Sequence, residues 1–541
     1  MSANERSDRH VTTVVSRRPR PGREREFEEF IRGITEAVSR FPGHVRTNIF
    51  RPRGRGNDEW RVMFTFDSPE NLGRWETSEE RRRWYERSQE LTLEEPRSED
   101  VTGTAQELPL ARALIPFDRF VRYSISGSAL LLLGALIALL WINSPLAEAH
   151  TGLFETEVTV GAGPFELSEP LLEWINEGLM ALFFFLMGLE IKRELLVGEL
   201  TSLRQAALPA IAALGGLLAP ALVYLVFNAG GEGANGWGIP MATDIAFAVG
   251  VLVLLGDRVP SSLRTFLVAL AIADDIGAVL VIALFYSEGI SWPALAVAAG
   301  LLLALTIAGR GGINYPLFYA FGGVLVWLAM FESGVHATVA GVLVAMTIPA
   351  RSWVNASTFL SRARTLLDDF ESSCSGVRSV LGNARQQATI EGLRVLGSRA
   401  ETPLQILEGR LERWVAFLVL PLFALANAAV DLSGVLEALA SPVTLGVALG
   451  LLVGKPVGIT LCTYLAVRLG LADLPSGVGW PHVAGVGVLG GIGFTMSLFI
   501  TGLAFEGEEL GEAAKVGIFA ASLAAGVAGW AFLRFAAPEG R

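Results

Sequence analysis

Two adjacent carboxylates, Asp274 and Asp275, stand near the middle of an apolar segment that runs from Arg264 to Phe285. The segment is long enough to cross a bilayer as a helix. An ionised Asp at that depth costs roughly 2.5–3.5 kcal/mol, so such residues usually face a cavity and have a function. Carboxylate oxygens suit hard cations such as Na⁺ and also bind protons. The pair predicts a site where Na⁺ and H⁺ compete; the alternative is a structural pair that only holds helices together.

Further polar residues interrupt two other apolar segments. Thr243 and Asp244 lie in GIPMATDIAFAVGVLVLL, and five glycines between Gly485 and Gly493 lie in GVGVLGGIGFTMSLFI. Interrupted segments at corresponding places in two halves indicate inverted repeats with two broken helices that cross near the membrane midplane. The alternative is that the glycines only permit close helix packing. Asp244 can neutralise the N-terminal ends of such half-helices, and Lys455, in GLLVGKPVGITL, can neutralise the C-terminal ends or pair with an Asp.

The composition predicts an integral membrane protein. The chain has 541 residues, of which 51% are hydrophobic, and its mean hydropathy is +0.46. Residues 1–100 contain 20 Arg and 20 acidic residues, so the net charge of −11 belongs to the remainder. An acidic membrane part suits cation transport and gives no basic surface for nucleic acid. We predict no cofactor, and the two cysteines indicate neither a disulfide framework nor a thiolate metal site.

Residues 118–535 predict a membrane domain of twelve transmembrane helices. Basic loops alternate with acidic ones along this domain, and basic loops remain in the cytoplasm. An even number of spans then places both termini in the cytoplasm of a multi-pass protein of the bacterial inner membrane. The expected spans are 122–141, 171–191, 205–227, 238–255, 264–285, 293–309, 315–331, 334–350, 412–430, 443–467, 482–504 and 512–535.

Two connections between these spans have a pattern of their own. Residues 154–168 alternate around a Gly-rich turn, which predicts an outward-facing β-hairpin. The exposed edge of a hairpin favours pairing with a second copy, so we expect a homodimer. Residues 351–411 are polar with helical patches and predict a mobile or regulatory cytoplasmic insertion.

Residues 1–100 predict a soluble α+β domain, joined to the membrane domain by the linker 101–117. The pattern of alternating and helical segments has the order β-α-β-β-α, part of a ferredoxin-like unit. With Trp60, Trp75 and Trp84, the domain resembles the antibiotic-biosynthesis-monooxygenase family of small, usually dimeric α+β barrels. No constellation of residues identifies a catalytic group, and we expect the aromatic residues to be core. A regulatory, dimerising or ligand-sensing role is therefore expected.

From Asp118 to Arg534 the chain resembles the NhaA-type sodium/proton antiporters. The matching stretches include INEGLMALFFFLMGLEIKREL, FLVALAIADDIGAVLVIALFY, ESGVHATVAGVLVA, LPLFALANAAV, GKPVGI and GIGFTMSLFI. The resemblance implies that Asp274 and Asp275 bind Na⁺ and protons, that Thr243 and Asp244 line the crossing, and that Lys455 is the membrane lysine. For the cytoplasmic funnel it implies Glu190, Lys192, Arg193 and Glu194, and for pH sensing Glu408. Glu177 stands where the family has an Asp at the periplasmic end of the second span, and the retained His336 is expected to be structural or pH-modulating rather than an ion ligand.

The resemblance implies electrogenic exchange of cytoplasmic Na⁺, or Li⁺, for external H⁺, active at alkaline pH. Gly409 and Glu412 stand where well-studied members have histidines, so the pH set-point is not predicted. A cation channel is one alternative and would need a continuous pore lined by acidic or carbonyl rings. A membrane-anchored enzyme with its chemistry in residues 1–100 is another, but twelve spans with buried charges exceed what an anchor needs. The lipid bilayer, Na⁺ and H⁺ are the expected partners.

Overall fold

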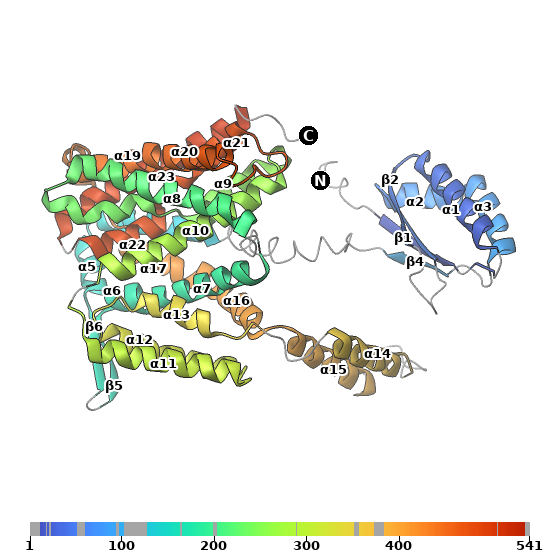
Figure 1. Ribbon diagram of the computed structural model, residues 1–541, viewed down its shortest axis with the longest axis horizontal. Helices are drawn as coiled ribbons and strands as arrows, with labels where there is room; N and C mark the ends of the chain where they lie inside the picture. Colours follow the sequence, from blue (N-terminus) through green and yellow to red (C-terminus); the bar gives the residue numbers. More distant parts are fainter. Residues whose placement is uncertain are drawn as a thin grey trace. The chain divides into compact units, whose positions relative to one another are not determined.

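The computed structural model divides the chain into two compact units, Met1–Phe117 and Asp118–Arg541, each described here by itself (Figure 1). The expected linker 101–117 lies, beyond Val101, outside the described residues. The residues that the structure describes are 11–17, 19–20, 23–50, 60–92, 97–101, 127–162, 165–198, 203–287, 289–350, 356–372, 384–505 and 507–535.

The first unit is an antiparallel sheet covered by helices, with the strand order β2-β3-β1-β4. Helix α1 buries apolar residues that recur at three- and four-residue intervals, and they pack against Val62, Phe64 and Phe66 of β3. Trp75 also belongs to this core, and Trp84 packs against it. The elements are β1 (Val11–Arg17), α1 (Glu24–Ser39), β2 (His44–Phe50), β3 (Trp60–Phe66), α2 (Pro69–Glu76), α3 (Glu79–Leu91) and β4 (Arg97–Val101).

Two details of this unit differ from the sequence pattern. The helical stretch after β3 is two helices, because the Ser78 side chain accepts a hydrogen bond from the Arg81 backbone N–H and starts α3 anew. Strand β4 was not predicted. Its sequence, RSEDV, is polar and has no alternation of apolar and polar residues, so no pattern indicated a strand. It pairs with β1 through the main chain.

The second unit is a bundle of apolar helices. Six helices are long and apolar enough to cross a membrane, and four bent pairs raise this number to ten among the described residues. Two further apolar helices, α12 (Pro316–Phe331) and α13 (Thr338–Thr347), are shorter. The six are Leu171–Val197, which includes α7 (Met180–Val197), α8 (Leu203–Asn228), α10 (Ser261–Phe285), α11 (Trp292–Arg310), Pro442–Arg468, which joins α19 (Pro442–Leu449) to α20 (Lys455–Arg468), and α23 (Glu508–Phe535).

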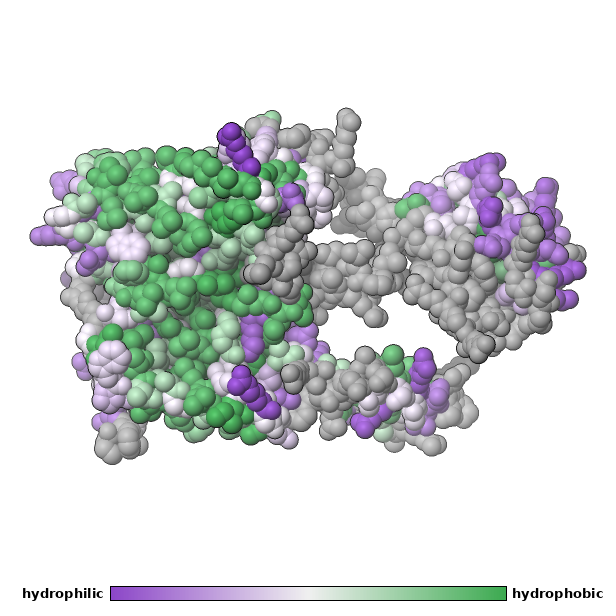
Figure 2. Space-filling view, viewed as in Figure 1, coloured by the Kyte–Doolittle hydropathy of each residue, from purple (hydrophilic) through white to green (hydrophobic). Residues whose placement is uncertain are grey.

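The four bent pairs include both segments that the sequence marked as interrupted. These are η3 (Glu232–Met241) with α9 (Ile245–Leu254), and α21 (Trp480–Gly490) with α22 (Phe494–Ala504). The other two are the helix Gly127–Ile142 with α5 (Ala147–Phe154), and Pro403–Asn427, which joins α16 (Pro403–Trp414) to α17 (Leu420–Asn427), with α18 (Val435–Ala438). Figure 2 shows apolar side chains over much of the visible surface of this unit, as a lipid-facing surface requires.

The structure defines the helices and strands of two predicted segments, the hairpin and the insertion. The hairpin consists of β5 (Glu157–Ala162) and β6 (Phe165–Pro170), because Phe154 is still the buried end of α5. Within the predicted insertion 351–411, the described residues form two helices, α14 (Ala356–Ser372) and α15 (Ala384–Ala400), and the first turns of a third. A capping box of Thr402 and Gln405 starts the next helix at Pro403.

Candidate ion-binding site at the crossing of two broken helices

The two helix breaks lie against each other and are joined by main-chain contacts. The pair η3 and α9 bends by 43°, and the pair α21 and α22 bends by 45°. The backbone N–H of Asp244, in the first break, donates to the carbonyl of Ile492 in the second at 2.7 Å. The Thr243 hydroxyl donates to the carbonyl of Gly490 at 3.0 Å. The breaks therefore satisfy each other's polar groups in the bundle interior.

Asp244 lies at the N-terminal ends of both following half-helices. Its carboxylate accepts from the backbone N–H of Phe247 in α9 and from that of Thr495 in α22, each at 3.2 Å. The Thr495 hydroxyl donates a further bond at 2.5 Å. This is the position expected for Asp244, because a negative charge is stabilised at a helix N-terminus. Thr495 was missed, although its place just after the Gly-rich break was a usable signal.

Lys455 lies at the opposite kind of helix end. Its ammonium donates to the carbonyl of Met241, the last residue of η3, and to Asp274 Oδ2 at 2.7 Å. The same Asp274 oxygen accepts from the Thr243 hydroxyl at 2.8 Å. Lys455 is 0% exposed and Asp274 2%, so this is a fully buried network. Both sequence interpretations of Lys455, at a C-terminal end and beside an Asp, agree with this geometry.

Asp275 has different surroundings from its neighbour. It is 1% exposed, and neither of its carboxylate oxygens has a hydrogen-bond partner within the described part of the chain. Thr243 and Lys455 bind Asp274 instead. The sequence interpretation placed both carboxylates and Thr243 around one ion. In the structure, Asp274 belongs to the hydrogen-bonded network with Thr243 and Lys455, and the Asp275 oxygens lie outside this network.

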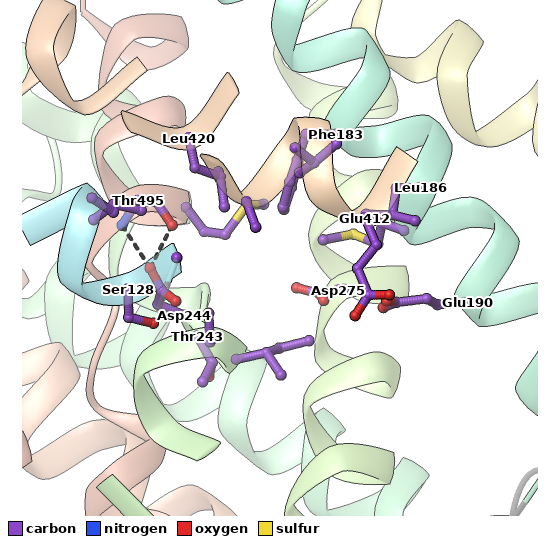
Figure 3. Close-up of a pocket in the computed structure, with 18 residues that line it drawn as sticks. Ser128, Phe183, Leu186, Glu190, Thr243, Asp244, Asp275, Glu412, Leu420 and Thr495 are labelled. Carbon is purple, nitrogen blue, oxygen red and sulfur yellow. Dashed lines mark hydrogen bonds between the residues drawn. The ribbon is translucent and has the colours of Figure 1, made fainter. Parts of the chain in front are cut away.

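Asp275 lines a cavity of about 100 Å³ (Figure 3). In the figure, Asp275 lies beside Glu190 and Glu412 at one end, and Asp244 lies with Thr495 and Ser128 at the other. The Ser128 hydroxyl is buried and has no hydrogen-bond partner among the residues described. Such a set of oxygen atoms can hold a hard cation or protons. Sequence reasoning missed Ser128 and gave Glu412 no place in the cavity.

The charged residues after Glu190 connect α7 to its neighbours. Arg193 forms an ion pair with Glu408 of α16 and also contacts Glu194 at 3.4 Å. Lys192 donates to the carbonyls of Met346, at 2.6 Å, and Ile348 at the C-terminal end of α13. Glu190, Glu194 and Glu408 therefore belong to one charged region. Lys192 instead binds the C-terminal end of α13.

Glu177 and His336 form a separate pair. Glu177 accepts from His336 Nδ1 at 3.0 Å and from the Thr338 backbone N–H at 3.3 Å. His336 Nε2 lies 2.7 Å from the carbonyl of Tyr286. Glu190 follows Glu177 by thirteen positions along this helix, a distance of about 20 Å along the axis. The structure therefore places the Glu177–His336 pair and the Arg193 region at opposite ends of this span.

A polytopic helical protein with two broken helices crossing beside buried carboxylates and a lysine is an ion-translocating membrane protein. The family model described as Na⁺/H⁺ antiporter 1 matches residues 118–533. This chain belongs to that family of transporters. It is a transporter and not an enzyme. A second model, antibiotic biosynthesis monooxygenase, matches residues 10–87.

Curated relatives cover most of the chain. The Na⁺/H⁺ antiporter NhaA of Oleidesulfovibrio alaskensis is 47% identical, over 80% of this chain and 97% of the relative. The Na⁺/H⁺ antiporter NhaA of Koribacter versatilis is 48% identical, over 79% of this chain and 92% of the relative. Among solved structures, the sodium proton antiporter MjNhaP1 from Methanocaldococcus jannaschii is distant, with 16% identity and a TM-score of 0.40 over 79% of this chain and 98% of that one.

Proposed function

We propose that this protein is a secondary active transporter that exchanges cytoplasmic Na⁺, with Li⁺ as a second substrate, for external H⁺. The observation that carries the proposal is the buried carboxylate of Asp275, which has no hydrogen-bond partner among the described residues and lies in a cavity lined by other carboxylates. A carboxylate in this position needs either a proton or a cation to remain away from water. The curated relatives are named as Na⁺/H⁺ antiporters, which supports the same exchange.

Exchange follows when the cavity opens alternately to each side of the membrane. Na⁺ entering from the cytoplasm displaces a proton from Asp275, and a proton from outside later displaces Na⁺. Asp274 provides a second proton-binding carboxylate. Na⁺ in the cavity changes the electrostatic potential at Asp274 and Lys455, and with it the affinity of Asp274 for a proton. Two carboxylates for one cation make the exchange electrogenic. The mechanism needs no cofactor beyond the transported ions.

The proposed architecture has twelve spans in inverted repeats, within residues 118–535. The six long helices, four bent pairs and two shorter apolar helices support this number. The similar bends of η3–α9 and α21–α22 support the repeat relation. The alternating loop charges support cytoplasmic termini in the bacterial inner membrane.

We further propose that pH regulation uses the contact between α7 and α16. The Arg193–Glu408 pair joins the helix that carries Glu190 to the helix that follows the insertion. A change in the protonation of Glu408 weakens this contact and alters access to the cavity. The Glu177–His336 pair holds the other end of the same span. Residues 1–100 act as a regulatory module, and the hairpin Glu157–Pro170 joins two copies as a homodimer.

Proton flux in everted membrane vesicles tests the exchange. NaCl added across a pH series should dissipate the proton gradient with the wild-type protein and with Asp368→Asn, an exposed residue of α14. Asp275→Asn should abolish the response. Normal exchange by Asp275→Asn would overturn the proposal. Na⁺ movement with no countermovement of H⁺ would instead identify a channel.

A further inference from the structure

An apolar groove runs over the outer surface of the membrane unit, apart from the ion cavity. It has a volume of about 850 Å³ and is walled by the helix Gly127–Ile142, α9 and α23. Leu132, Leu136, Leu254, Leu523 and Val527 line it, and each is more than half exposed. All three walls belong to helices of the apolar bundle, so the groove opens to the hydrocarbon of the bilayer.

The floor of the groove is formed by side chains from the helix breaks. The rings of Phe247 and Phe494 lie 5.2 Å apart, and those of Phe494 and Phe519 lie 5.6 Å apart. Phe247 belongs to the first turn of α9, where its backbone N–H binds Asp244. Phe494 is the first residue of α22, and its backbone N–H donates to Ser522, at 3.2 Å, in the same groove. Any occupant therefore packs against the starts of both half-helices.

One end of the groove has a positive charge, that of Arg534. The Arg534 guanidinium lies 5.5 Å from the ring centre of Trp530, which lines the groove, and 5.9 Å from that of Phe535. Arg534 makes no ion pair with any residue of the described chain. The loop charges assign this end of α23 to the cytoplasmic side, where anionic headgroups attract basic residues. A guanidinium stacked on an indole keeps its N–H groups available for a phosphate.

We propose that the groove binds an anionic phospholipid of the cytoplasmic leaflet, with one acyl chain along the phenylalanine floor and its phosphate on Arg534. The bound chain stabilises the arrangement in which α9 and α22 begin beside Asp244. Charge complementarity at Arg534, together with the hydrocarbon environment of the walls, favours a lipid over a second copy of this protein. The lipid thus becomes a structural partner of the helix crossing.

Gly526 offers a way to fill the groove without disturbing the bundle. It lines the groove, and a Cβ added there meets only Ile492 Cδ1, at 3.8 Å, an ordinary contact. Gly526→Leu therefore occupies the lipid position with its own side chain. Gly300→Leu is the matched control, because Gly300 is exposed on α11 with no atom within 4 Å of an added Cβ. Arg534→Gln removes only the charge.

The experiment counts lipids bound to the purified full-length protein by native mass spectrometry. Each protein is titrated with palmitoyl-oleoyl phosphatidylglycerol, or with phosphatidylcholine carrying the same chains. We expect wild type and Gly300→Leu to retain one more phosphatidylglycerol per chain than Gly526→Leu. Arg534→Gln should lower the retention of phosphatidylglycerol about fivefold. It should thereby also lower the preference of the protein for phosphatidylglycerol over phosphatidylcholine.

A second readout locates the effect within the protein. Hydrogen exchange at residues 245–248 and 494–497 should slow when phosphatidylglycerol binds wild type, and should not respond to the lipid in Gly526→Leu. Equal lipid retention by all four proteins would overturn the proposal. A change from dimer to monomer in Gly526→Leu with unchanged lipid retention would also overturn it and would assign the groove to a second copy. Neither readout depends on ion transport.

Discussion

Asp274 and Asp275 are neighbours in the sequence, yet a helix turns by about 100° between consecutive residues. Their carboxylates therefore meet different partners. Asp274 is held by Lys455 and Thr243, whereas Asp275 faces the cavity with no partner among the residues described. At the residue scale, this division supports the proposed roles: Asp275 exchanges Na⁺ and a proton, and Asp274 compensates the charge of Lys455 and takes the second proton.

The buried pair of Asp274 and Lys455 predicts a stability defect that a second substitution repairs. Asp274→Leu leaves the Lys455 ammonium buried without its carboxylate, which costs about 3–5 kcal/mol. We expect a marked fall in the unfolding temperature of the detergent-solubilised protein. Adding Lys455→Met should restore most of it. If the double variant were no more stable than the single one, the pair would not be the source of the defect.

The buried hydroxyl of Ser128, which has no hydrogen-bond partner in the described part of the chain, predicts a role for this residue in binding the cation. Ser128→Ala removes a neutral oxygen from the cavity wall, and an interaction of about 0.5–1.5 kcal/mol corresponds to a two- to tenfold rise in KM for Na⁺. The maximal exchange rate should not change. Thr463→Ala is the control, since that buried hydroxyl bonds to its own helix at Ile459, 2.6 Å away. An unchanged KM in Ser128→Ala would exclude Ser128 as a ligand.

At the scale of elements, a close helix contact determines where Lys455 lies. A Cβ added at Gly458 would stand 2.1 Å from the carbonyl oxygen of Gly215, and one added at Gly215 would stand 2.2 Å from that of Gly458. Helices α8 and α20 therefore touch backbone to backbone, as small residues permit in membranes. Because α20 begins at Lys455, this contact positions the ammonium against Met241 and Asp274.

This contact predicts that Gly458→Ala displaces the site. The methyl group cannot fit against a backbone carbonyl, so α8 and α20 must separate, at a cost of about 1–3 kcal/mol or more. We expect lower stability and reduced Na⁺-dependent proton flux. Gly502→Ala, where an added Cβ meets no atom within 4 Å, should leave both unchanged. Wild-type flux in Gly458→Ala would show that the spacing of the two helices does not govern Lys455.

At the scale of the whole molecule, the two units have separate cores. The core of the first unit consists of residues between Phe27 and Leu91, and the membrane clusters contain none of them. A chain lacking residues 1–100 should therefore insert and exchange Na⁺ for H⁺, with any change confined to the pH response. The measurement is proton flux in vesicles across a pH series. Loss of all flux, with normal insertion, would give the first unit an essential role in transport.

The hairpin of β5 and β6 predicts that two copies of the chain form a dimer. Strands β5 and β6 project Val160, 55% exposed, while the Trp174 indole N–H donates to the Val158 carbonyl at 2.9 Å and anchors the hairpin base. Replacing residues 159–168 by a short Gly-Ser turn should convert dimers into monomers and leave exchange intact. Analytical ultracentrifugation in detergent measures this directly. Dimers that persist would place the interface elsewhere.

The sequence by itself determined which residues are candidates for the ion site, because polar residues inside apolar spans are costly and therefore informative. Asp274, Asp275, Asp244 and Lys455 stood out for this reason, and the structure places all four at the helix crossing. Glycines and a proline within otherwise helical segments marked the two breaks. Periodicity likewise identified the hairpin and the elements of the first unit, apart from the division between α2 and α3 and from β4, which pairs with β1.

Only the tertiary structure decided which oxygen atoms line the cavity. Ser128 and Thr495 are ordinary hydroxyl residues in their own segments, and nothing local distinguishes one that bonds its own helix from one that faces a cavity. Glu412 reaches the cavity because α16 begins at Pro403 and lies beside α7. The different partners of Asp274 and Asp275 also depend on residues far away in the chain. Side-chain direction and long-range neighbours are properties of the packed bundle, and local sequence does not encode them.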